Sequence, residues 1–339
     1  MKQFFTQRHF LDYTSHMTEN LITVYTIREP SVDLLYDTLQ ISLFDEELKD
    51  QVKPAPDFVN KIVNGDCETI LPALPAESID LIFTSPPYAD QRSSTYGGID
   101  ADQYVAWFLP KADEFLRVLK PNGSFVLNIK ERVVKGERHT YVIELILAMR
   151  NRGWFWTEEY IWHKKNSHPG KWPNRFRDNW ERLIHFTKQK QFNMYQDEVM
   201  VPVGDWAKSR LKNLSETDQK RDESRVGSGF GKNISNWVNR DMVYPSNVLH
   251  MATECYNRQH SAVFPVDLPA WFIKLFTKPG DIVLDPFNGS GTTCVAASRL
   301  KRDYIGIDIN QSFCELAINR LAKDQLRTPA GRNNGSIKH

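Results

Sequence analysis

The segment Thr84–Tyr88, with the sequence Thr-Ser-Pro-Pro-Tyr, combines groups that could activate a weak nucleophile. The Ser85 hydroxyl and the Pro86 carbonyl oxygen can both accept hydrogen bonds, and proline fixes the φ angle that holds this carbonyl in place. An aromatic amine is a poor nucleophile because its lone pair is delocalised into the ring. Two acceptors at one amine would favour a more tetrahedral nitrogen with a localised lone pair. The plain structural alternative is a proline-stiffened surface turn.

The ring of Tyr88 adds a face on which an aromatic base could stack. The same face would tolerate a positive charge passing through the site. The candidate catalytic residues are therefore Ser85, Pro86, Pro87 and Tyr88.

A second segment whose residues could bind a ligand is the turn Asp285–Thr293, with the sequence Asp-Pro-Phe-Asn-Gly-Ser-Gly-Thr-Thr. It follows the apolar run Ile282–Leu284 and opens a helix, so its backbone amides would favour an anionic group. A dinucleotide site would prefer GxGxxG, but Cys294 replaces the third glycine and Asp285 would repel a pyrophosphate. The turn suits a zwitterion better, such as the methionine part of S-adenosylmethionine, with its carboxylate on the amides and Thr hydroxyls and its ammonium on Asp285.

Asp308 ends the next apolar run and could accept hydrogen bonds from both hydroxyls of a ribose. Taken alone, the glycine segment could instead be a strand-to-helix turn with a purely structural role. The two aspartates at two strand ends favour a cofactor site. The candidate cofactor contacts are Asp285, Phe287, Gly289, Ser290, Gly291, Thr292, Thr293 and Asp308.

The segments Thr84–Tyr88 and Asp285–Thr293 can act together only if the fold brings the ends of their two preceding strands close to each other. The apolar run Ile79–Phe83 is typical of a buried strand, and apolar residues recur at helical spacing from Tyr104 to Leu119. The alternation of strand and helix covers residues 59–164 and returns with the helical segment Leu268–Phe276. We therefore predict an α/β fold with a doubly wound, mostly parallel sheet built from two separated pieces. The two chemical segments would meet at its carboxyl edge, where open α/β sheets bind ligands.

Basic side chains are concentrated in one segment although the net charge of the 339 residues is only +1. Residues 163–190 hold eight Lys/Arg and two Asp/Glu, whereas residues 1–58 hold five and ten. A basic segment with interleaved aromatic residues suits a polyanion, because each charge could neutralise a phosphate or read a guanine edge. A solvated surface is the alternative. The candidate DNA contacts are Lys164, Lys165, Lys171, Arg175, Arg177 and Arg182.

The two motifs, in this order, resemble the permuted, or beta-group, DNA amino methyltransferases, in which the catalytic motif precedes the cofactor motif. Asn64–Cys67 is similar to the family segment whose acidic residue lies near the cofactor adenine, which implies that role for Asp66. Glu181–Lys188 resembles the strand before the target-recognition region, and His260–Pro265 resembles the segment that leads into the cofactor half. Ser261 departs from the proline that the family commonly has there.

The resemblance covers about residues 60 to 325 and implies a fold of the S-adenosylmethionine-dependent methyltransferase type. The serine of the first motif resembles the cytosine-N(4)-specific enzymes of restriction-modification systems. It implies methylation of the exocyclic amino nitrogen of a flipped cytosine in double-stranded DNA, with a cognate restriction endonuclease as a functional partner. Adenine stays open as the target, because a neutral serine can serve either amine.

We considered three other interpretations of the sequence. RNA could be the substrate, since the amine chemistry is common to both polymers. A nicotinamide-dependent oxidoreductase could share the fold, but the missing third glycine and the Ser-Pro-Pro-Tyr segment speak against it. The intact amine site speaks against a DNA-binding module without catalytic activity.

We expect five parts in the chain, which differ in pattern and charge. They are an acidic N-terminal extension (1–58), a catalytic half (59–164), an irregular basic target-recognition region (165–245), a cofactor-binding half (246–325) and a polar tail (326–339). The four cysteines lack CxxC or CxH spacing, so we expect no metal site. The sequence has no run of about 18 apolar residues and its start lacks a secretory signal, so we expect a cytoplasmic protein without a membrane partner.

Overall fold

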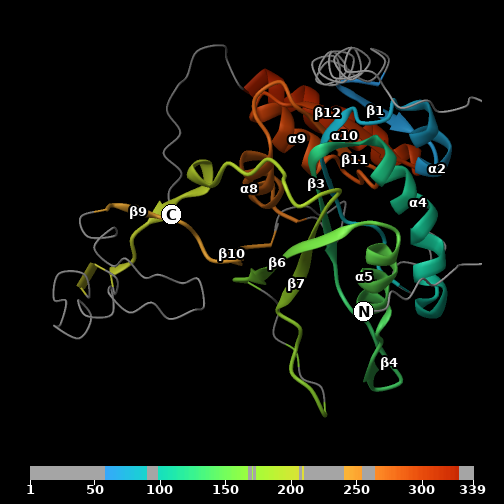
Figure 1. Cartoon of the computed structure of the whole chain (residues 1–339), viewed down its shortest axis with the longest axis horizontal. Coiled ribbons are helices and arrows are strands. Elements are labelled where there is room, and N and C mark those ends of the chain that lie inside the picture. Colours follow the sequence, from blue (N-terminus) through green and yellow to red (C-terminus); the bar gives the residue numbers. More distant parts are fainter. Residues whose placement is uncertain are drawn as a thin grey trace, which may run out of the picture. The chain divides into compact units, whose positions relative to one another are not determined.

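An eight-stranded sheet forms the scaffold, in the order β1-β12-β11-β2-β3-β7-β6-β10 (Figure 1). The computed structural model describes residues 58–89, 98–166, 170, 173–205, 208–209, 240–253 and 264–327. The strands of the sheet are β1 (Lys61–Asn64), β2 (Ile79–Thr84), β3 (Leu119–Ile129), β6 (Phe155–Lys164), β7 (Trp180–Thr187), β10 (Val248–Met251), β11 (Ile282–Asp285) and β12 (Asp303–Asp308).

Only β7 runs against its neighbours in this sheet. The pairs from β1 to β3 are parallel, β7 is antiparallel to both β3 and β6, and β10 is parallel to β6. The predicted mostly parallel α/β sheet is therefore confirmed. Strands β11 and β12, which come last in the chain, lie between β1 and β2, which come first. The carboxyl ends of four strands from both pieces of the chain thus share one edge.

Helices cover both faces of the sheet. In the part of the chain that the structure describes, the helices are α2 (Cys67–Ile70), α4 (Tyr104–Val118), α5 (Tyr141–Asn151), α8 (Asp267–Phe276), α9 (Thr292–Arg299) and α10 (Gln311–Arg327). Because successive strand residues point to opposite faces, Ile82 joins the apolar cluster under α4 and α5, while Leu81 and Phe83 join the cluster under α8 and α9. A strand that is buried on both faces is mostly apolar, which explains the run Leu81–Phe83. The charged residue of this strand, Asp80, is buried with partners, because its carboxylate accepts from Lys120 Nζ and from the Ile282 amide.

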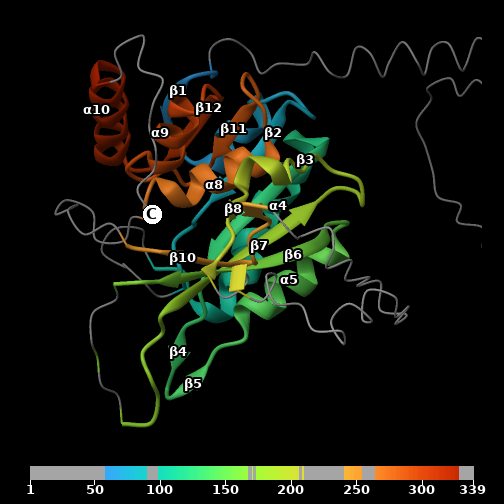
Figure 2. The same ribbon diagram turned by 90° about the vertical axis from the view of Figure 1, so that its left-hand side faces the viewer.

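Short elements complete the described part of the chain. Three 3₁₀ turns, η1 (Leu71–Ala73), η2 (Ala101–Gln103) and η3 (Gln196–Val199), join longer elements. Two small hairpins pair β4 (Val133–Val134) with β5 (Glu137–Arg138) and β8 (Val201–Pro202) with β9 (Met242–Val243). Figure 2 shows β1, β11 and β12 near α9 and α10, and β6, β7 and β10 at the other end of the sheet.

Residues 165–245, expected to be irregular apart from the strand implied at Glu181–Lys188, contribute one full strand to the central sheet. This strand, β7, pairs over its length with β3 and β6. Its apolar residues Leu183, Ile184 and Phe186 are fully buried, and such burial is the physical reason for its place in the sheet. In the described part of the chain, we find no helix with the length and apolar character needed to cross a membrane.

Candidate functional site

The candidate residues converge because four neighbouring parallel strands end at one edge. Asp66 follows β1, Asp308 ends β12, Asp285 ends β11 and Ser85 follows β2. Hydrogen bonds join these ends: the Gly65 amide donates to the Asp308 carbonyl oxygen at 3.0 Å. The candidate catalytic and cofactor segments, far apart in sequence, thus lie at the same edge of the sheet.

The Asp285 carboxylate is the link between the cofactor turn and the Ser-Pro-Pro-Tyr segment. Its Oδ1 accepts a hydrogen bond of 2.7 Å from the Thr84 hydroxyl and one of 3.1 Å from the Phe287 amide. Burial raises the pKa of Asp285 to about 6, and these hydrogen bonds oppose the shift. A buried carboxylate whose charge is only partly compensated attracts a cation.

Asp308 holds the glycine turn in place. Its Oδ2 accepts a 2.7 Å hydrogen bond from the Gly289 amide, and its Oδ1 accepts one of 2.9 Å from the Asn310 amide. Burial raises the pKa of Asp308, and the hydrogen bonds from the two amides oppose this increase.

Gly291 precedes α9 with φ of 82°, and a Cβ atom there would lie 2.7 Å from Cβ of Ala317. Glycine is required at this position for both conformation and space.

Several predicted cofactor residues already have partners within the protein. Arg320 of α10 donates to the carbonyl oxygen and the hydroxyl of Ser290, at 2.7 and 2.8 Å, and to the Thr292 hydroxyl at 3.1 Å. Phe287 packs on Trp107 with ring centroids 5.8 Å apart. These contacts fix the shape of the turn, and Thr293 is fully buried at the start of α9.

Asp66 caps the first turn of α2. Its Oδ1 accepts a hydrogen bond of 2.9 Å from the Glu68 amide. The residue is otherwise exposed, so the carboxylate keeps acceptor capacity next to the end of β12.

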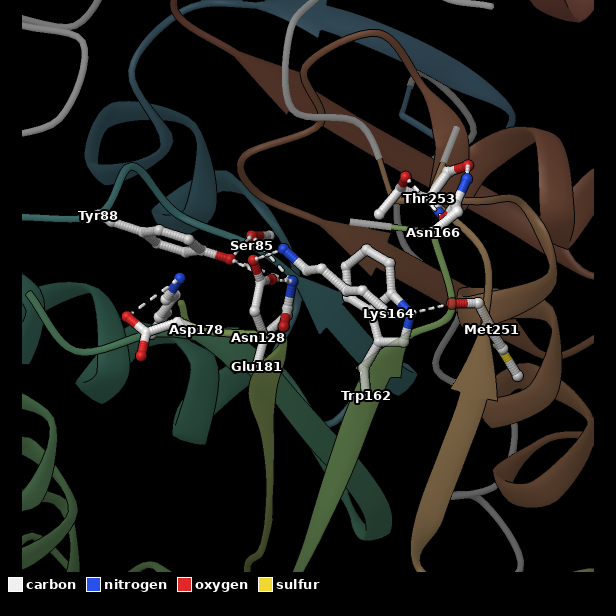
Figure 3. Close-up of polar contacts among 11 residues, drawn as sticks. Ser85, Tyr88, Asn128, Trp162, Lys164, Asn166, Asp178, Glu181, Met251 and Thr253 are labelled. Atoms are coloured by element: carbon white, nitrogen blue, oxygen red, sulfur yellow. Dashed lines mark hydrogen bonds and ion pairs between the residues drawn. The ribbon is translucent and has the colours of Figure 1, made fainter. Parts of the chain in front are cut away.

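The Ser85 hydroxyl belongs to a network of polar side chains (Figure 3). It donates to the Tyr88 hydroxyl at 3.3 Å, and Tyr88 donates to Oε2 of Glu181 at 2.8 Å. Asn128 Nδ2 lies 3.4 Å from Ser85 Oγ, 3.2 Å from Tyr88 Oη and 3.1 Å from Glu181 Oε2. Lys164 Nζ forms an ion pair with Glu181 Oε1. Burial first, and then the Glu181 charge, raise the pKa of Tyr88 well above its usual value.

Asn128 and Glu181 are site residues that sequence reasoning did not assign. Asn128 lies on β3 and Glu181 on β7, and both are nearly fully buried, at 1% and 7% exposure. Polar side chains are rarely buried without a partner, so a polar residue inside an apolar strand pattern is a usable signal. Their convergence on Ser85 depends on the pairing of β3 with both β2 and β7, which the sequence pattern does not specify.

The predicted DNA contacts occupy different environments. Lys165 is exposed, and Arg175 lies 3.9 Å from the Asp178 carboxylate. Lys164 pairs with Glu181, and Arg182 forms ion pairs with Glu131 and Glu159. The sequence did not predict these internal partners of Lys164 and Arg182. Lys171 lies outside the described residues, as do Ser261 and most of His260–Pro265.

Comparison with known proteins identifies the family of the chain. The profile of the N6/N4 DNA methylase family matches residues 79–319. The chain is 31% identical over 273 residues to the type II methyltransferase M.PvuII of Proteus hauseri, covering 74% of this chain and 80% of that protein. It is 30% identical to the type II methyltransferase M.BglII of Bacillus subtilis, over 78% of this chain and 69% of that protein.

Solved structures show the same fold. The PvuII DNA methyltransferase (cytosine-N4-specific) superposes with a TM-score of 0.58 at 26% identity, over 78% of this chain and 91% of that one. TTHA0409 of Thermus thermophilus, solved in complex with S-adenosyl-L-methionine, superposes with a TM-score of 0.52 at 23% identity. The superposition with TTHA0409 covers 78% of this chain and 94% of the TTHA0409 chain, and it supports the assignment of the fold. The chain therefore belongs to the N6/N4 DNA methylase family, and it is a DNA methyltransferase.

Proposed function

We propose that this enzyme transfers a methyl group from S-adenosylmethionine to the exocyclic N4 nitrogen of a flipped cytosine in double-stranded DNA. The observation that supports it most is the hydrogen bond from Thr84 to Asp285, which joins the amine-activating segment to the cofactor turn. Ser85 is a neutral acceptor at the first motif position, and a similar solved methyltransferase bears the description cytosine-N4-specific.

The residues at the strand ends fit the cofactor by their chemistry. Asp285 would hold the ammonium of the methionine part, and Asp308 and Asp66 would accept hydrogen bonds from the ribose and the adenine. Asn288 Nδ2 is buried within the turn without a hydrogen-bond partner among the described residues, so a donor is available there. We assign the cofactor contacts to Asp66, Asp285, Phe287, Gly289, Ser290, Gly291, Thr292, Thr293 and Asp308. When bound, the cofactor supplies an electrophilic methyl group on a sulfonium sulfur.

The protein's own contribution is to position and polarise the amine. Ser85 Oγ and the Pro86 carbonyl oxygen accept its two hydrogens, which directs the nitrogen lone pair towards the methyl group. We assign Tyr88 and Pro87 to the pocket for the flipped base, with the Tyr88 ring as the stacking partner and its hydroxyl held by Glu181.

DNA docking depends on the basic segment. We propose that Lys165, Lys171, Arg175 and Arg177 contact phosphates or base edges, and that Lys164 and Arg182 lie at the border between this surface and the site. We also propose a cognate restriction endonuclease that shares the recognition sequence, since the similar M.PvuII and M.BglII are type II methyltransferases.

The test is a product analysis. The purified enzyme is incubated with unmethylated duplex DNA and methyl-labelled cofactor, and the DNA is digested to nucleosides that are identified by chromatography against standards and by mass. We expect N4-methyldeoxycytidine from the wild type and none from Ser85→Ala. N6-methyldeoxyadenosine would instead identify adenine as the target, and label that enters RNA but not DNA would overturn the DNA substrate.

A further inference from the structure

Ser85 Oγ is one end of a hydrogen-bond chain with a defined direction. Glu181 as a carboxylate can only accept, so the Tyr88 hydroxyl hydrogen points to Glu181 and the Ser85 hydrogen points to Tyr88. Both hydroxyl hydrogens are therefore directed away from the position of the target amine. Ser85 is left with lone-pair density for an incoming N–H group, which is the role that the proposed function requires.

Asn128 fixes this direction from the adjacent strand. Its Nδ2 lies within 3.4 Å of Ser85 Oγ, Tyr88 Oη and Glu181 Oε2. Only the amide nitrogen can face a carboxylate, because the amide oxygen would be repelled. The three acceptors thus share one donor that is buried in the sheet, so Ser85 and Tyr88 each present a lone pair, and not a hydrogen, to this amide.

Lys164 balances the charge at the far end of the chain. Its ammonium pairs with Glu181 Oε1, while Oε2 receives Tyr88 and Asn128. Tyr141 of α5 also interacts electrostatically with this carboxylate, and burial raises the pKa of both Tyr88 and Tyr141 above the usual value. Tyr88 is thus a neutral phenol that can both donate and accept a proton.

We infer that Glu181 receives, through Tyr88 and Ser85, the proton that the target nitrogen loses during methyl transfer, an inference that rests on the proposed function. The new N–C bond forms as the C–S bond breaks and its electron pair goes to sulfur, which leaves the nitrogen positively charged. The nitrogen proton passes to Ser85 Oγ, the Ser85 proton to Tyr88 Oη, and the Tyr88 proton to Glu181 Oε2. Glu181 acts through two other side chains and is a positioning residue.

The test compares kcat, KM and the pH profile of Glu181→Gln with those of the wild type. The cofactor is kept at a saturating concentration, so that titration of Asp285 does not limit cofactor binding. Glutamine can accept the Tyr88 hydrogen bond but cannot take the proton. We expect kcat to fall about 100-fold, the scale of acid–base assistance, while KM for cofactor and DNA changes less than about threefold. The acid limb of the wild-type kcat profile should be absent in the variant, and Glu181→Asp should recover part of kcat.

Two further variants keep the inference testable if Glu181→Gln misfolds. Tyr88→Phe interrupts the chain but leaves the Glu181–Lys164 pair, and it should lose the same acid limb. The matched control is Glu158→Gln, an exposed glutamate on β6 that should behave as wild type. Wild-type kcat and pH profile in both Glu181→Gln and Tyr88→Phe would overturn the relay, whereas absence of methylated DNA with the wild type would overturn the proposed function itself.

Discussion

The Thr84 hydroxyl donates a 2.7 Å hydrogen bond to Oδ1 of Asp285, across 201 positions of sequence. Thr84 ends β2 and Asp285 ends β11, and the two parallel strands are neighbours in the sheet. The residue that follows Thr84 is the proposed amine activator, and Asp285 is the proposed partner of the cofactor ammonium. The strand pairing places the two halves of the site side by side, and this bond joins their side chains directly.

Thr84→Val removes this bond with little change in shape. At pH 8, where Asp285 is ionised, we expect the free energy of unfolding to fall by about 2 kcal/mol, because hydrogen bonds to charged groups contribute most. At pH 5, below the Asp285 pKa, the loss should be about 1 kcal/mol. Urea denaturation at the two pH values checks this, with the exposed Thr69→Val as control. Equal losses at both pH values would contradict the assignment.

Asp285→Asn should separate stability from function. The folded-state pKa is raised from 3.8 to about 6, so ionisation disfavours folding: the stabilising contribution is complete below pH 3.8 and is lost as pH rises through 6. This difference in pKa between the unfolded and folded states corresponds to about 3 kcal/mol as an upper limit. We expect the variant without cofactor to be more stable than wild type at pH 8 but not at pH 4.

The same variant should lose the rise in melting temperature that S-adenosylmethionine gives the wild type, because its ammonium partner is gone. Thermal shifts across pH 4 to 8, with and without cofactor, measure both effects. Asp205→Asn, a substitution at an exposed aspartate, is the control. A variant that still responds to the cofactor would show that Asp285 does not hold it.

Ser85→Ala should reduce kcat about 100-fold and leave cofactor binding unchanged, since the hydroxyl is proposed to act on the amine. Single-turnover methyl transfer and a cofactor thermal shift make this comparison. If the variant loses cofactor binding and turnover together, Ser85 is needed for the shape of the site and the amine role is not supported.

Gly291→Ala and Gly280→Ala distinguish backbone strain from steric conflict. Both glycines have positive φ, 82° and 89°, but a Cβ at Gly291 would lie 2.7 Å from Cβ of Ala317, whereas at Gly280 nothing lies within 4 Å. We expect a loss of about 1 kcal/mol at Gly280 and of about 3 kcal/mol at Gly291, with weaker cofactor binding only at Gly291. Denaturation curves and cofactor titrations check both, and equal losses would show that α10 moves away without cost.

Lys165→Gln and Arg182→Gln should affect DNA binding differently. Lys165 is exposed, and its loss should reduce the slope of log K against log salt by about 0.9. Arg182 holds Glu131 and Glu159 together, so its loss should lower the free energy of unfolding by about 1 to 2 kcal/mol with little change in slope. Binding titrations between low and moderate salt decide this, and a reduced slope for Arg182→Gln would assign it a phosphate contact.

The sequence by itself determined the chemistry and the type of fold. The mostly apolar run Ile79–Phe83 and the glycine turn after Leu284 are local signals. The spacing of apolar residues and the conformation of a turn both depend on near neighbours in the chain. Ser85, Asp285 and Asp308 could thus be placed at strand ends, and the order of the motifs indicated the family. Strand order is a different kind of information, since it depends on contacts between residues far apart in sequence.

The tertiary structure decided which side chains surround Ser85. The placement of β7 beside β3 brings Glu181 to Asn128, and the pairing of β6 with β7 adds Lys164, so a residue predicted for DNA contact lies in an ion pair within the site. Pairing energy comes from burial across strands, and many orders of the same strands bury similar apolar area. Only the folded sheet selects the order that turns separate polar residues into one connected network.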